Sequence, residues 1–191
     1  NAASNFSTGA AAFERCAYTK VLVPFQLQQP DRKGIHVRFV DVTGKAFGSN
    51  TSAKAFRGPI GIMDIKQDGS QDLLVMTQEN SFQLLINTNG TFTPLGPALP
   101  GIPGARYHRS LVGDLQNDRN EDVIVLGDHG SHVFRFATNG AMTDVSQFSR
   151  LNDLTAIDGA LVDLDFTGKT DLLAITDTNT VRVFRNLGNL Y

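Results

Sequence analysis

The chain has 191 residues, 41% of them hydrophobic and 19% charged, and a formal net charge of −2 at pH 7. This composition is typical of a globular protein with a buried core, and the lack of a basic run argues against a nucleic-acid or anionic-membrane partner. The single cysteine, Cys16, excludes an intrachain disulfide and a zinc site made of several cysteines.

Residues 1–36 carry no copy of the repeat described below, and we interpret them as an N-terminal segment that is either the edge of a preceding unit or a separate module. The stretch "AAAFERC" suffices for one or two helical turns, and strand-like runs follow it. No basic segment precedes an apolar core, so we expect no signal peptide in this sequence. The string "VRFVDVT" (37–43) is similar to "AMTDVS" (141–146), which predicts an outer strand and the start of a repeat region over 37–191.

An acidic loop recurs along the chain at nearly constant spacing. It reads "DIKQDGSQD" at 64–72, "DLQNDRNED" at 114–122 and "DLDFTGKTD" at 163–171, so the first aspartates are 50 and 49 residues apart. Such a period indicates copies of one supersecondary unit. We place the units at about 56–100, 105–150 and 155–191.

The sequence of each unit predicts a series of short β-strands, taken here in chain order. An apolar run leads into the acidic loop, and a strongly apolar strand ("DLLVMT", "DVIVLG", "DLLAIT") follows it. A polar turn and an alternating strand come next, and Asn89–Gly90 and Asn139–Gly140 then predict tight hairpins into a fourth strand.

Four antiparallel strands with this period predict an all-β fold, a partial β-propeller of three four-stranded blades. The last blade is expected to be incomplete, because the sequence reaches Tyr191 where its outer strand should begin. A closed ring needs at least about four blades, so we expect a fragment of a larger propeller.

The run "ALVDLDFTGKTDLLAITD" resembles the FG-GAP and VCBS repeats of integrin α-like propellers, and "RFVDVTGKAFG" resembles a stretch of bacterial ASPIC/UnbV-type proteins. The resemblance covers about residues 37–191. It implies a propeller that acts in adhesion or protein assembly, at the cell surface or in extracellular or periplasmic fluid.

The loop consensus of that family has the chemistry of a calcium site. When loop positions are numbered 1 to 9 from the first Asp, side chains at positions 1, 3, 5 and 9 and the backbone carbonyl at position 7 supply oxygens, as calcium prefers. A glycine at position 6 permits the sharp turn.

The third loop is the best candidate for calcium. It offers Asp163, Asp165, Thr167 and Asp171, with Gly168 at the turn and Lys169 contributing its backbone carbonyl. The loss of one charge at Thr167 leaves an oxygen in place, so we expect weak binding.

The other two loops are weaker candidates. The second keeps its oxygens, through Asp114, Gln116, Asp118, Asp122 and the Asn120 backbone carbonyl, but Arg119 replaces the turn glycine. A left-handed conformation costs a non-glycine residue about 1–2 kcal/mol, so the loop either tolerates this cost or changes its geometry. In the first loop Lys66 stands at position 3, and its ammonium is expected to pair with the surrounding carboxylates in place of an ion.

A purely structural interpretation of the loops remains open. The first Asp can close an Asx-turn, and the last can accept backbone N–H groups at the strand entrance. The hairpin would then fold without an ion.

Two other polar clusters carry weaker predictions. "GDHGSHV" (127–133) aligns with the turns between the second and third strands, which indicates a surface turn, although His129 and His132 are spaced closely enough for a chance transition-metal pair. "ARYHRS" precedes an inner strand, and aromatic and arginine side chains together suit interfaces. The weak interface candidates are Arg106, Tyr107, His108 and Arg109.

The sequence therefore predicts a non-catalytic scaffold. It contains no P-loop, GxSxG or HExxH motif. We expect protein interaction or adhesion, with another protein or domain as partner, no nucleic acid and no membrane insertion. Self-association through an open blade face is a further expectation. A carbohydrate-binding propeller is the alternative, although the turns share no aromatic residue and tryptophan is absent.

Overall fold

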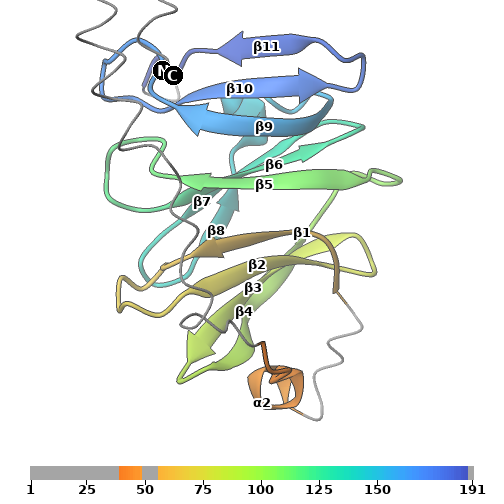
Figure 1. Cartoon of the computed structure of the whole chain (residues 1–191), viewed down its shortest axis with the longest axis vertical. Coiled ribbons are helices and arrows are strands. Elements are labelled where there is room, and N and C mark those ends of the chain that lie inside the picture. Colours follow the sequence, from red (N-terminus) through yellow and green to blue (C-terminus); the bar gives the residue numbers. More distant parts are fainter. Residues whose placement is uncertain (1–38, 49–55, 189–191) are drawn as a thin grey trace, which may run out of the picture. The chain divides into compact units, whose positions relative to one another are not determined.

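The computed structural model describes residues 39–48 and 56–188 (Figure 1). The chain divides into two compact units, residues 1–41 and 42–191. The second unit holds the helices and strands described below; the helical turn expected at 10–16 lies outside the described residues. In the part of the chain that is described, no helix is both long enough and apolar enough to cross a bilayer.

Three antiparallel sheets follow one another along the second unit, which confirms the predicted all-β, partial β-propeller fold. The first contains β1 (Phe56–Met63), β2 (Asp72–Thr77), β3 (Ser81–Thr88) and β4 (Thr91–Pro100). The second contains β5 (Tyr107–Gly113), β6 (Asp122–Gly127), β7 (His132–Phe136) and β8 (Met142–Asp144). The third contains, within the described residues, β9 (Ala156–Val162), β10 (Asp171–Thr176) and β11 (Val181–Phe184).

The first strands of the three sheets lie side by side, β1 beside β5 and β5 beside β9, so the sheets stack as neighbouring blades (Figure 1). Because side chains alternate between the two faces of a strand, β6 serves two cores. Val123 and Val125 pack with Leu74 and Met76 against the first sheet. Ile124 and Leu126 pack with Leu172 and Ala174 against the third sheet; they do not belong to the first core.

The two hairpins into the outer strands differ. Asn89 and Gly90 have φ values of 54° and 82°, and they join β3 to β4 as the tight turn that Asn-Gly predicts. In the second sheet pairing ends at Phe136, and the connection from Ala137 to Ala141 is longer, closed by a hydrogen bond from Ala137 N–H to the Ala141 carbonyl. The hairpin predicted at 139–140 therefore forms, with a φ of 83° at Gly140 and a hydrogen bond of 2.7 Å from the Gly140 N–H to the Ala137 carbonyl, but its loop is longer than that at Asn89–Gly90.

A helical turn follows the segments that were expected to be outer strands. α3 (Ser146–Ser149) begins directly after β8, and α2 (Thr43–Phe47) occupies the same place in "VRFVDVT". The residues before the two helices have nearly the same backbone, with φ and ψ of −115° and 17° at Val145 and −117° and 16° at Val42. The similarity between these strings is thus real, but no strand is assigned over residues 39–42.

Candidate functional site

The three acidic loops share one backbone conformation. In each, the two oxygens of the first Asp accept the N–H groups of positions 5 and 6; in the third loop Thr167 N–H and Gly168 N–H lie 3.1 and 2.8 Å from the Asp163 carboxylate. The first and second loops repeat these bonds at Asp64 and Asp114. Each loop turns through positive φ at position 4 and again at position 6. The first Asp therefore helps to hold the hairpin shape through hydrogen bonds to the loop backbone.

Arg119 adopts the same left-handed backbone as the glycines of the other loops. Its φ is 70°, against 84° at Gly69 and 77° at Gly168. The second loop has therefore kept its geometry and tolerates the cost that a side chain adds to this conformation.

The last Asp of each loop is buried at the start of the following strand. Asp72, Asp122 and Asp171 are at most 2% exposed. In each loop one oxygen accepts the N–H of position 2 at 3.2 Å. These carboxylates link the loop to the core, as the structural interpretation requires.

The third loop alone, among the described residues, brings three carboxylates together. Oxygen atoms of Asp163, Asp165 and Asp171 lie within 4.8 Å of one another. The Thr167 hydroxyl donates to Asp165 Oδ1 at 2.7 Å, and the Lys169 ammonium points to the Leu187 carbonyl at 2.9 Å. This oxygen-rich set fits a hard cation such as calcium, and calcium binding stays a prediction.

Cationic side chains already approach two of the loops. The Arg185 guanidinium bonds to Asp165 in the third loop, and Arg135 Nη2 lies 3.1 Å from Asp118 Oδ2 in the second. A cation at Asp165 would compete with Arg185. The Asn120 N–H also bonds to the Asp118 carboxylate and lowers its pKa below the ordinary value, with Arg135 adding to the effect.

Lys66 does not take the place of an ion in the first loop. Its side chain is exposed, and within the described residues it forms no ion pair with the carboxylates around it. The expected internal neutralisation of this loop is wrong, because the side chain at position 3 extends into solvent and gains more from hydration than from pairing.

Neighbouring loops are tied together through position 4. The Gln67 side-chain amide donates to the Arg119 carbonyl at 2.8 Å, and Asn117 donates to the Gly168 carbonyl at the same distance. Phe166 takes this position in the third loop, has a φ of 57° and is 93% exposed. The sequence motif gave no sign of this link, because it joins residues about 50 positions apart.

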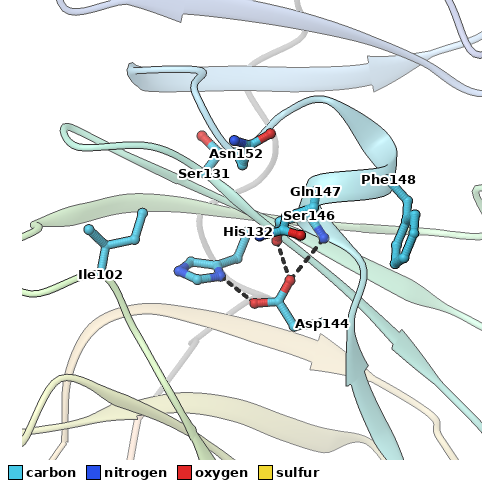
Figure 2. Close-up of a pocket in the computed structure, with 8 residues that line it drawn as sticks. All are labelled: Ile102, Ser131, His132, Asp144, Ser146, Gln147, Phe148 and Asn152. Atoms are coloured by element: carbon cyan, nitrogen blue, oxygen red, sulfur yellow. Dashed lines mark hydrogen bonds and ion pairs between the residues drawn. The ribbon is translucent and has the colours of Figure 1, made fainter.

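A polar network lies in the second sheet, beside a cavity of about 330 Å³ (Figure 2). Three of its four side chains are buried, and the fourth, Asp144, is exposed. The Tyr107 oxygen accepts the Ile102 N–H at 2.8 Å and forms a hydrogen bond of 2.9 Å with His132 Nε2. His132 Nδ1–H then donates to Asp144 at 2.7 Å, and Ser146 also donates to Asp144.

Burial and hydrogen bonding set the ionisation of this network. Burial alone would raise the pKa of Asp144, but hydrogen bonds from His132 and Ser146 outweigh it and hold that pKa below the ordinary value. Burial raises the pKa of Tyr107. All four side chains bond to one another or to the backbone, so the network joins β5, β7 and β8 as a structural brace.

This network corrects two predictions. His132 is 7% exposed and both its nitrogens are occupied, whereas His129 is exposed beside Asp128, so the two imidazoles form no metal pair. The sequence offered no local signal for a buried His132, because its partners come from residues 107 and 144.

Tyr107 is 5% exposed and belongs to the core, so it is not part of the predicted interface patch. Arg106, His108 and Arg109 are exposed, and Arg109 Nε lies 3.6 Å from Asp158 Oδ1 on β9. The pairing of β5 with β6 is irregular between Tyr107 and Arg109, so two consecutive residues, His108 and Arg109, are exposed beside a buried Tyr107.

The repeated loops and sheets agree with a known repeat. The FG-GAP-like repeat matches residues 64–125 and again residues 114–174, which together span more than half of the chain. The chain belongs to the FG-GAP-like repeat family. Each FG-GAP-like match begins at the first Asp of one acidic loop and continues through the next loop into the strand that follows it. A search of curated proteins gave no match.

Proposed function

We propose that this FG-GAP-like protein is a non-catalytic scaffold that binds another protein, in adhesion or assembly. The observation that carries the proposal is the use of the repeated polar groups within the fold: the first and last Asp of every loop bond to the backbone. We therefore assign partner binding to residues that differ between the repeats.

The exposed residues Arg106, His108 and Arg109 form the surface we assign to the partner. Arg106 and Arg109 bring guanidinium groups to the start of an inner strand, and arginine is enriched in protein interfaces. The partner surface is accordingly expected to be acidic.

A photo-crosslinking residue at position 108 tests this surface in cells that make the protein. We expect a defined adduct from position 108 and none from a control at Thr93, an exposed position on β4. Charge reversal at Arg106 and Arg109 should abolish the adduct. Equal crosslinking from positions 108 and 93 would contradict the proposal.

We also propose weak calcium binding at the third loop through Asp163, Asp165, Thr167, Asp171 and the Lys169 carbonyl. The second loop, with Asp114, Gln116, Asp118, Asn120 and Asp122, is the weaker site. A bound ion would neutralise carboxylates that now lie within 4.8 Å of one another in the third loop.

Calorimetry with calcium alone separates this site from the structural role of the loops. Asp163→Ala and Asp64→Ala remove the same two backbone hydrogen bonds. Only Asp163→Ala should abolish the heat of calcium binding. Arg185→Gln should increase the affinity for calcium, because it removes the competing guanidinium. An unchanged heat signal in Asp163→Ala would exclude the site.

Carbohydrate binding is the second candidate, favoured by one observation in Figure 2. Phe148 is 69% exposed at the 330 Å³ cavity, and Gln147 and Asn152 line the same cavity. An exposed ring beside amide groups suits a sugar, which needs an apolar face and hydrogen bonds. Titration with a panel of neutral oligosaccharides should detect binding that Phe148→Ala removes and Phe166→Ala, another exposed aromatic, leaves intact.

We propose an extracellular or periplasmic location and kinship with ASPIC/UnbV-type proteins. The support is the "RFVDVTGKAFG" string (38–48), together with the weak calcium site, which only fluids with free calcium near about 1 mM would fill. Protease accessibility of the protein in intact cells tests the location; full protection would contradict it.

A further inference from the structure

The second and third acidic loops each lie against an arginine from the third strand of the same sheet. Strand pairing places Arg135, on β7, beside the buried Asp122. In the same way Arg185 follows β11 beside the buried Asp171. In the first sheet the corresponding residue is Ile86, which is 4% exposed and belongs to the core. The sheet therefore forms without an arginine at this place, so the role of Arg135 lies in what its guanidinium contacts.

The Arg135 guanidinium contacts two carboxylates of the second loop. Its Nη2 lies 3.1 Å from Asp118 Oδ2 at loop position 5, and its Nε lies 3.9 Å from Asp122 Oδ1 at position 9. Both carboxylates belong to the set of oxygens that the loop consensus offers to calcium. A planar guanidinium with several N–H donors suits carboxylates, so one side chain supplies positive charge to both.

Arg135 is held more firmly than Arg185. Its side chain is 38% exposed and its Nε is buried, whereas the Arg185 side chain is 63% exposed. In the described part of the chain Arg185 pairs with one carboxylate, that of Asp165. An exposed ion pair contributes little, but breaking a buried one leaves a carboxylate without its counter-charge. A cation should therefore displace Arg185 more easily than Arg135.

The arrangement of the carboxylates agrees with this difference. The third loop brings carboxylate oxygens of three residues within 4.8 Å of one another, and no such group forms in the second loop, all of which the structure describes. The backbone does not cause the difference, because Arg119 has the same left-handed conformation as Gly168. At position 3 Gln116 still offers an oxygen, so the positive charge of Arg135 is the feature that opposes a bound cation.

We propose that Arg135 is the cation of the second loop, and that its guanidinium opposes the binding of calcium there. The inference rests on the calcium proposal above, in which the second loop is the weaker site, and names the residue that makes it weaker. The charge balance that was expected from Lys66 inside the first loop is thus supplied to the second loop from a neighbouring strand. The second loop keeps its shape and its paired carboxylates whatever the calcium concentration of the surrounding fluid.

Calcium titration of the full chain, followed by the amide NMR signals of residues 114–122, tests the inference. Asp163→Ala is present throughout, so that the third loop does not contribute. Adding Arg135→Gln should lower the calcium concentration that half-saturates the second loop at least about tenfold, because it removes a positive charge beside the ligands. Adding Arg135→Lys should leave that concentration nearly unchanged, since the ammonium keeps the charge.

Two further variants serve as controls. Arg182→Gln removes the same charge from an arginine whose guanidinium lies over the Phe184 ring at 4.8 Å, and it should not change the calcium affinity of the second loop. Asp165→Asn replaces Asp163→Ala if that variant gives no dispersed spectrum, because within the described residues Asp165 bonds to side chains and not to the backbone.

Three results would overturn the inference. The first is no gain in calcium affinity with Arg135→Gln, and the second is an equal gain with Arg182→Gln. The third is a gain with Arg135→Lys as large as that with Arg135→Gln, because charge would then not be the cause. The calcium proposal for the third loop is judged separately, from the signals of residues 163–171 in the parent chain. If these do not respond, that proposal fails, and the inference still stands where Arg135→Gln opens the second loop.

Discussion

The second acidic loop differs from the first and third at the carboxylate that all three bury. Asp72 accepts a second backbone N–H, from Asn87 at 2.8 Å, and Asp171 accepts one from Asn186 at 2.7 Å. The residue at the equivalent place in the second blade is Ala137, whose N–H bonds to Ala141 instead. Among the residues that the structure describes, Asp122 therefore keeps one backbone donor, Leu115, with Arg135 Nε at 3.9 Å.

This missing donor changes the ionisation of Asp122. Desolvation raises its pKa from 3.8 to about 6, and the Leu115 N–H and Arg135 only partly offset the rise. The comparison shows that a repeat can keep a buried carboxylate and its position while losing the group that stabilises its charge.

The largest effect is expected from removing a fully bonded carboxylate. Asp171→Ala leaves the Leu164 and Asn186 N–H groups without their acceptor and should lower the free energy of unfolding by about 3 kcal/mol. Asp122→Ala should cost about 1 kcal/mol or less at pH 7, because it leaves one N–H unpaired and also removes an unfavourable buried charge. Urea unfolding of both variants measures the difference, and equal losses would remove the distinction between the blades.

The second-largest expected effect is the dependence of the free energy of unfolding on pH that Asp122 causes. The folded-state pKa of Asp122, about 6, lies above its value of 3.8 in the unfolded chain, so its contribution to stability is complete below pH 3.8 and declines as pH rises to about 6. Asp122→Asn should therefore gain about 2–3 kcal/mol relative to the parent between pH 4 and pH 7.

Unfolding is followed in EDTA at several pH values, and the difference between the two proteins is taken at each. The lowered pKa values of Asp118, Asp128 and Asp144 act in the opposite direction, destabilising at low pH. Asp128 and Asp144 are not among the groups that act on Asp122, so their contributions cancel in the difference, whereas Asp118 interacts with Asp122 and is part of the effect measured. A difference that does not change with pH would contradict the raised pKa.

A smaller effect distinguishes the contribution of the Asn87 side chain from that of the Asn87 backbone N–H in the first blade. Asn87→Ala copies the residue found in the second blade and removes hydrogen bonds to the Gln71 carbonyl and from the Gly90 N–H. We expect a loss of about 1 kcal/mol, with no new acid dependence, because the backbone N–H that bonds to Asp72 remains. The same unfolding series tests this, and an acid dependence like that of Asp122 would assign the effect to the side chain.

The smallest effect concerns the turn residue of the loop. Arg119→Gly relieves a left-handed backbone with a φ of 70° and should stabilise the protein by about 0.5–1 kcal/mol. Gly168→Ala is the matched reverse change, since an added Cβ meets nothing within 4 Å, and it should cost a similar amount. If the loops share one geometry, the melting temperature should rise in Arg119→Gly and fall in Gly168→Ala. Changes of the same sign would contradict this.

The strands, their order and the loop positions could be predicted because they depend on local alternation and on a period repeated along the chain. The third loop also keeps the oxygens named from its sequence within reach of one another. Metal occupancy and the partner surface stay predictions.

Features that depend on contacts between distant residues could not be predicted. His132 is buried by Tyr107 and Asp144, and the amide of Asn117 finds its acceptor on a different loop. The helix α3 has only four residues, too few to show a helical period. A weak signal was available in Asp144-x-Ser146, a pattern that favours a local side-chain bond to the backbone.

The hydrogen bonds between loops end on main-chain oxygens, at Arg119 and at Gly168. A carbonyl is present whatever the side chain, so the accepting residue is free to change while the donor is not. This explains how an arginine and a glycine serve the same junction. Sequence drift can alter the charge of each loop tip while the alignment of neighbouring blades is preserved.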